Sequence, residues 1–129
     1  MNLKREDLKI LLVDDSDFSR QLIKTMLKEE GFVVSAEANS AESALGSIKE
    51  SNPHVMITDI VMPQVSGIEL TEKVTQNFDD ISVIVISSLS QEHVVLEAIG
   101  AGARDFIAKP IQKQQIVDSL DKLIQEING

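Results

Sequence analysis

Residues 8–15 read LKILLVDD, an aliphatic run that ends on two aspartates. A near-continuous apolar run is typical of a strand that is covered on both faces, as in a parallel sheet. Three further apolar runs also end on polar residues: residues 55–58 on Asp59, 81–86 on Ser87 and 105–108 on Lys109. Parallel strands share one direction, so the residues that end them lie along one edge of the sheet, where ligands bind. The sequence therefore predicts that its polar chemistry is concentrated at the carboxyl edge of a parallel sheet.

Segments with helical periodicity alternate with these apolar runs. The apolar residues of the first segment repeat at three and four positions: Leu22, Ile23, Met26 and Leu27. The last segment shows the same repeat: Ile116, Val117, Leu120, Leu123, Ile124 and Ile127. Both stripes are typical of helices that pack on a sheet. Residues 32–36 read as one more strand, so strands and helices alternate along the whole chain.

Capping residues predict where three of the helices begin. Asn39 with Glu42, and Ser66 with Glu69, have the spacing of a capping pair, and Ser90 precedes the fourth helical segment. The connections are short, and five βα units in succession predict an open parallel sheet with helices on both faces. We therefore expect a doubly wound α/β fold with five helices and a five-stranded sheet in the order 2-1-3-4-5.

Composition excludes several classes of function. The chain of 129 residues has no cysteine, which removes thiol catalysis and disulfides. A formal net charge of −9 and 3% aromatic residues argue against a nucleic-acid binder. No segment resembles a signal peptide, and no apolar run approaches the roughly 20 residues that span a bilayer. We expect a cytoplasmic protein whose partners are proteins, with no membrane or nucleic-acid partner.

The predicted strand order has a consequence for three aspartates. The first and third strands would be neighbours, so Asp14, Asp15 and Asp59 would converge. Carboxylates this close repel one another unless a cation binds or one of them keeps a proton. Mg²⁺ prefers such hard oxygen ligands and leaves positions open for a phosphoryl oxygen. Ser87 and Lys109 could then hold two further oxygens of a transferring phosphoryl group.

These residues resemble the receiver domain of two-component response regulators, most of all the free-standing chemotaxis type. The resemblance runs from about residue 9 to residue 127. It rests on motifs that stand at strand ends in the family's order: Asp14-Asp15, Asp59-Ile60-Val61-Met62-Pro63 followed by Gly67, Ser87-Ser88, and Lys109-Pro110. The family has the flavodoxin-like form of the fold, with the same strand order.

The resemblance implies a phosphorylation site and its cofactor. Asp59 would be phosphorylated by a sensor histidine kinase. Asp14, Asp15, Asp59 and the backbone carbonyl of Val61 would bind Mg²⁺.

The resemblance also implies catalytic and switch residues. Ser87 and Lys109 would contact the phosphoryl oxygens and act with Asp59 in catalysis. Ser87 and Phe106 would form the conformational switch, with the aromatic ring turning inward on phosphorylation, although Phe106 fits a simple core position equally well. The family also has a cis peptide bond before the proline that corresponds to Pro110.

The function that follows is that of a stand-alone response regulator in a two-component phosphorelay. It is a signalling protein, not an enzyme, because it catalyses only its own phosphorylation and dephosphorylation. We expect a single receiver domain over residues 1–129, with a core at about 9–127 and no output domain, that acts as a cytoplasmic monomer. Its target would be a flagellar switch component or a phosphorelay protein, reached around the fourth helix, fifth strand and fifth helix. A phosphatase could reset it.

Three alternatives remain open from the residues. Residues 15–19 fit the Asp-x-Asp-x-Ser nucleophile motif of haloacid-dehalogenase-like phosphatases, which would make Asp15 the phosphorylated residue of an enzyme. A flavin-binding module of the same fold would need a hydroxyl- and glycine-rich phosphate loop after the first strand and aromatic residues around the flavin, whereas residues 14–17 would repel its phosphate. A receiver that is not phosphorylated would act as an interaction scaffold.

Overall fold

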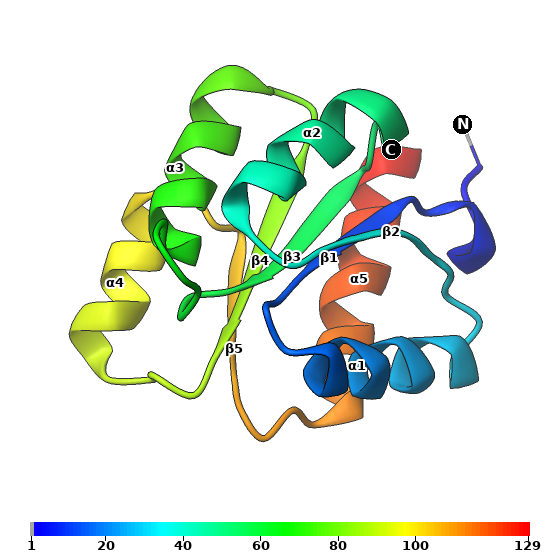
Figure 1. Ribbon diagram of the computed structural model, residues 1–129. Coiled ribbons are helices and arrows are strands. Elements are labelled where there is room, and N and C mark those ends of the chain that lie inside the picture. Colours follow the sequence, from blue (N-terminus) through cyan, green and yellow to red (C-terminus); the bar gives the residue numbers. More distant parts are fainter. Residues whose placement is uncertain (1) are drawn as a thin grey trace.

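A computed structural model describes residues 2–129 and contains one five-stranded parallel sheet in the order β2-β1-β3-β4-β5 (Figure 1). The strands are β1 (Ile10–Val13), β2 (Val34–Ala38), β3 (Val55–Asp59), β4 (Ser82–Ser87) and β5 (Asp105–Ala108). The α-helices are α1 (Asp17–Glu29), α2 (Ala41–Ser51), α3 (Gly67–Asn77), α4 (Glu92–Gly100) and α5 (Lys113–Asn128), preceded by a short 3₁₀ helix, η1 (Arg5–Asp7). The predicted fold class, strand order and number of helices are confirmed.

The helices form two layers, one on each face of the sheet. Figure 1 shows α1 and α5 on one face and α2, α3 and α4 on the other. Alternate residues of β1 face the two layers, because side chains alternate along a strand. Ile10 and Leu12 pack in the cluster with α1 and α5, whereas Leu11 and Val13 pack in the cluster with α2 and α3. Both faces are therefore covered, as the unbroken apolar strands predicted.

The register brings the strand ends to one edge. Val13 at the end of β1 pairs with Thr58 in β3, and Asp59, the next residue of β3, pairs with Ile86 in β4. At the other side of β4, Ser87 pairs with Ala108. The residues that follow β1, β3, β4 and β5 thus lie along the same carboxyl edge.

Two predicted helix starts are wrong. Ser40, with an extended backbone, is the N-cap of α2, and its hydroxyl accepts a hydrogen bond from the Ser43 N–H at 3.2 Å, so Asn39 with Glu42 is not the capping pair. Gln91, not Ser90, holds the N-cap position of α4. The Ser66 cap is confirmed, because its hydroxyl accepts from the N–H of Glu69.

The second strand begins two residues later than residues 32–36 predicted. Gly31 has a φ of 85°, and the N–H of Phe32 donates to the carbonyl of Leu27 at 3.0 Å. This is the Schellman arrangement that ends α1, in which the residue after the glycine makes an apolar contact with the last helical turn. Phe32 is therefore buried as part of the helix end and not as part of β2.

The apolar stripe of α1 is narrower than predicted. Ile23 and Leu27 are buried, but Leu22 is 53% exposed.

No helix among residues 2–129 is long and apolar enough to cross a membrane.

Candidate functional site

One ammonium group joins two of the strand-end carboxylates. The Nζ of Lys109, which follows β5, lies 3.0 Å from Oδ2 of Asp59 and 3.4 Å from Oδ2 of Asp14. Asp59 ends β3 and Asp14 follows β1, so the contacts span three strands. The structure thus brings together Asp14, Asp59 and Lys109, which lie far apart in the sequence. The peptide bond between Lys109 and Pro110 is cis, as the resemblance implied.

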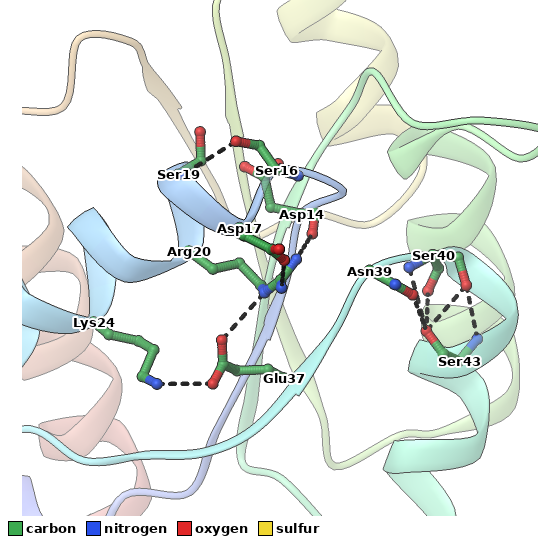
Figure 2. Close-up of polar contacts among 10 residues, drawn as sticks. All are labelled: Asp14, Ser16, Asp17, Ser19, Arg20, Lys24, Glu37, Asn39, Ser40 and Ser43. Carbon is green, nitrogen blue, oxygen red and sulfur yellow. Dashed lines mark hydrogen bonds and ion pairs between the residues drawn. The ribbon is translucent and has the colours of Figure 1, made fainter.

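Hydrogen bonds fix both the backbone and the side chain of Asp14. It is 2% exposed, its N–H donates to the carbonyl of Ala38 at 3.1 Å, and its Oδ1 accepts from the N–H of Ser16 at 2.9 Å. Its backbone carbonyl accepts a hydrogen bond from the guanidinium of Arg20 (Figure 2). A buried carboxylate is costly unless it is paired and hydrogen-bonded, and here both conditions are met.

Asp59 is more accessible than Asp14. Its side chain is 13% exposed, against 3% for that of Asp14. Its Oδ1 accepts from the N–H of Ile60 at 2.7 Å, and its Oδ2 accepts from Lys109. The carboxylate is therefore oriented by its partners and remains open on one side.

The first residue of α3 packs directly against the end of β3. The N–H of Gly67 donates to the carbonyl of Ile60 at 2.8 Å. A Cβ at Gly67 would overlap the carbonyl oxygen of Asp59, and it would lie 2.7 Å from the carbonyl carbon of Asp59 and 2.9 Å from the Cα of Ile60. Only glycine fits this approach, so Gly67 determines where the backbone of Asp59 lies. Sequence reasoning found Gly67 as part of a motif but could not see this contact.

The carboxylates raise the pKa of Lys109. Burial alone lowers it, but the hydrogen bond and charge of Asp59 and the charge of Asp14 outweigh burial and raise the pKa above its ordinary value. Lys109 is therefore a permanent cation at neutral pH, and its charge offsets part of the repulsion between the two aspartates.

Ser87 lies at the same edge with its hydroxyl already engaged. It is fully buried, and its Oγ accepts the N–H of Leu89 at 3.0 Å. Its backbone carbonyl accepts the N–H of Lys109 at 3.0 Å. The hydroxyl is thus linked to Lys109 through the backbone, and it points into the loop that follows β4.

Three further predicted residues lie outside the contacts of Lys109 with Asp14 and Asp59. Asp15 is exposed directly after Asp14, and Val61 is 57% exposed in the loop after β3. Phe106 in β5 is partly buried against the cluster that contains α2 and α3. This position between core and solvent is compatible with either role predicted for Phe106.

The oxygen atoms at this edge fit Mg²⁺. Among residues 2–129, no three His, Cys, Asp or Glu side chains form a cluster that could by itself hold a metal, so Asp15 does not converge with Asp14 and Asp59 as predicted. Mg²⁺ does not need one, because it binds through one or two carboxylates and keeps several waters. Asp14 and Asp59 share a cationic partner, and Asp15 and the carbonyl of Val61 follow them directly in the chain. The available donors are all hard oxygens, as Mg²⁺ prefers.

Comparison with known proteins identifies the family. Residues 10–121 match the response regulator receiver domain, so the chain belongs to that family. Receiver domains are signalling modules rather than enzymes; they accept a phosphoryl group from histidine kinases and bind Mg²⁺ for this reaction.

Several curated relatives are chemotaxis proteins. The chemotaxis protein CheY of Thermotoga maritima is 36% identical over 115 residues, which cover 89% of this chain and 96% of that protein. CheY of Bacillus subtilis is 37% identical over 116 residues, which cover 90% of this chain and 97% of that protein. The crystal structure of the CheX-CheY-BeF₃-Mg²⁺ complex from Borrelia burgdorferi matches with a TM-score of 0.84 at 28% identity, covering 91% of this chain and 89% of that one. This chain is therefore a CheY-like receiver.

Proposed function

We propose that this receiver is a stand-alone, chemotaxis-type response regulator that is phosphorylated on Asp59 by a sensor histidine kinase. The observation that carries the proposal is the contact of Lys109 with both Asp59 and the buried Asp14, at 3.0 and 3.4 Å. The match to CheY relatives at 36% and 37% identity supports the chemotaxis part of the proposal.

Asp59 is the nucleophile because its carboxylate is the more accessible of the two that contact Lys109. One of its oxygens forms a bond to phosphorus as the bond between phosphorus and the donor imidazole nitrogen breaks, which leaves an acyl phosphate on Asp59. Lys109 and Ser87 hold phosphoryl oxygens, and Asp14 and Asp15 with the carbonyl of Val61 would help to hold Mg²⁺. When bound, Mg²⁺ would neutralise charge on the phosphoryl oxygens.

The kinase docks beside Lys109. Phe18 and Leu22 are 78% and 53% exposed and lie one turn apart on α1, so their side chains are neighbours. Contiguous exposed apolar surface of this kind marks protein contact sites. A shallow groove next to them is lined by Leu22, Met26, Lys109, Pro110 and other residues of α1 and of the loop after β5. A helix bound there would bring a donor histidine close to Asp59.

The signal leaves through the surface around α4, β5 and α5. Leu96 and Ile99 on α4 are 63% and 45% exposed, and Phe106 lies in the adjoining strand. Movement of Ser87 toward the new phosphoryl oxygens would free space for the ring of Phe106, which couples the site to this surface. A flagellar switch component is the target that fits the chemotaxis relatives.

Chemical phosphorylation tests the proposal. Acetyl phosphate with Mg²⁺ should add one phosphoryl group that is labile to hydroxylamine, and Asp59→Asn should abolish the labelling. The matched control is Asp15→Asn, which should slow labelling by impairing Mg²⁺ binding but keep the acceptor. Labelling that survives in Asp59→Asn and disappears in Asp15→Asn would instead support the haloacid-dehalogenase-like alternative.

A further inference from the structure

Arg20 connects the acidic site to the edge strand of the sheet (Figure 2). It lies in the first turns of α1, and its side chain is only 13% exposed. One terminal nitrogen donates to the backbone carbonyl of Asp14 and the other to the carboxylate of Asp17, while Nε donates to Oε1 of Glu37 at 3.1 Å. One guanidinium therefore binds the residue that follows β1, the first residue of α1 and the residue before the last of β2.

Glu37 is a firm anchor for Arg20. Its second carboxylate oxygen accepts a hydrogen bond from the Nζ of Lys24 at 2.8 Å. The hydrogen bond from Lys24 is the largest effect that lowers the pKa of Glu37, and the contacts with Arg20 add to it against the opposing effect of burial. Glu37 is thus a carboxylate at neutral pH, and it holds the guanidinium against β2.

The carbonyl of Asp14 needs the partner that Arg20 supplies. The residue is buried, and a buried carbonyl without a hydrogen bond carries a substantial free-energy cost. The peptide unit is planar, so the carbonyl oxygen of Asp14 and the N–H of Asp15 move together. Fixing that oxygen fixes the plane that joins Asp14 to Asp15, and with it the directions from which both side chains leave the backbone.

We propose that Arg20 is a positioning residue for the acidic site, where it orients the Asp14–Asp15 peptide so that the two carboxylates bind a divalent cation together. This inference rests on the proposed Mg²⁺ site and adds a residue to it that does not touch the metal. It gives a reason for a cation to lie close to a site that must attract another cation. Charge alone would make Arg20 weaken Mg²⁺ binding, so positioning and charge act with opposite signs.

The opposite signs make the role testable without a phosphodonor. We expect Arg20→Lys and Arg20→Ala each to weaken Mg²⁺ binding by about 10-fold, the effect typical of losing a partner that orients a metal ligand. Lysine keeps the charge but lacks the planar fork that reaches the Asp14 carbonyl and Glu37 together. The measurement is the Mg²⁺ dissociation constant from titration of backbone amide shifts, with the unfolding temperature of each metal-free variant recorded in parallel.

The control is Arg104→Ala. Arg104 also makes a two-nitrogen contact, with Glu126, but it precedes β5 and so lies at the opposite end of the sheet from the site. Its loss should leave the Mg²⁺ dissociation constant unchanged. Amide hydrogen exchange at Asp14 and Asp15 in metal-free protein gives a second measurement, and it should speed up in the Arg20 variants but not in Arg104→Ala.

Each outcome decides a separate point. Mg²⁺ affinity in Arg20→Lys that equals or exceeds that of the unaltered protein would overturn the role of Arg20, whatever the unfolding temperature. An unaltered protein that does not bind Mg²⁺ would instead overturn the proposed metal site itself. If Arg20→Ala does not fold, the lysine variant decides the matter, because it keeps the charge and the aliphatic stem.

Discussion

Replacing Gly67 by alanine should damage the site around Asp59 through backbone displacement. The new methyl carbon would lie 2.7 Å from the carbonyl carbon of Asp59. Favourable contacts between carbon atoms begin at about 3.5 Å, so the overlap with this carbon is about 0.8 Å. The methyl carbon would overlap the carbonyl oxygen of Asp59, its nearest neighbour, more severely still. The atoms that must yield are backbone atoms at the end of a buried strand, which cannot rotate away as a side chain can.

The overlap sets the size of the expected effects. Overpacking of this kind costs about 1–3 kcal/mol, so we expect the free energy of unfolding to fall by that amount. Displacement of the Asp59 backbone by nearly an ångström should slow phosphorylation by acetyl phosphate by about 100-fold, because the reaction depends on the position of the nucleophile. Urea unfolding followed by circular dichroism measures the first effect, and the initial labelling rate measures the second.

Gly46→Ala is the matched control. Gly46 lies inside α2, and no atom of residues 2–129 comes within 4 Å of the position that its Cβ would take, apart from the helix's own backbone and its chain neighbours. Alanine should therefore stabilise the protein by about 0.5–1 kcal/mol, because glycine is a poor helix former. The two substitutions are chemically identical and should have opposite signs. A Gly67→Ala protein with unchanged stability and labelling rate would refute the reasoning.

Three further predictions concern the metal, the pH dependence and the lifetime of the phosphorylated state. Asp14→Asn should raise the unfolding temperature of metal-free protein, because it removes repulsion with Asp59. It should also reduce the stabilisation by Mg²⁺, which for a bound ion reaches about 2.7 kcal/mol at 100 times the dissociation constant. Calorimetric unfolding with and without Mg²⁺ measures both effects, and an unaltered protein whose unfolding temperature does not change with Mg²⁺ would contradict the site. Lys24 and Arg20 lower the pKa of Glu37, so its contribution to the free energy of unfolding is present above pH 4.5 and is lost as pH falls through the folded pKa. Glu37→Gln should remove this pH-dependent loss, which is less than about 1 kcal/mol because the side chain is partly exposed. Urea unfolding across acidic pH measures it, and the same change of unfolding free energy with pH in both proteins would exclude the effect. The side chains of Val61 and Leu89 are 57% and 38% exposed and cannot hydrogen-bond a hydrolytic water, so the phosphoryl group on Asp59 should be hydrolysed slowly. The double variant Val61→Asn, Leu89→Glu should lose it about 10-fold faster or more. Loss from the unaltered protein within seconds, or an equal rate in the variant, would contradict this prediction.

The architecture could be predicted because its signals are local. Residues 105–108 coincide with β5, and the apolar repeat at residues 116–127 falls within α5. Short connections and unbroken apolar strands then leave few ways to assemble a parallel sheet. The helix boundaries were less predictable. Ser40 and Ser43 hydrogen-bond the free backbone N–H groups at the start of α2, and several nearby polar residues could have done the same.

The sequence by itself determined which polar side chains reach the carboxyl edge, because strand direction and strand ends are properties of the chain. The contacts of Lys109 with Asp14 and Asp59 follow from that placement. Only the tertiary structure decided that Gly67 must lack a side chain and that Arg20 holds the carbonyl of Asp14. Both facts depend on distances of a few ångströms between separate elements, which packing sets and no local pattern records.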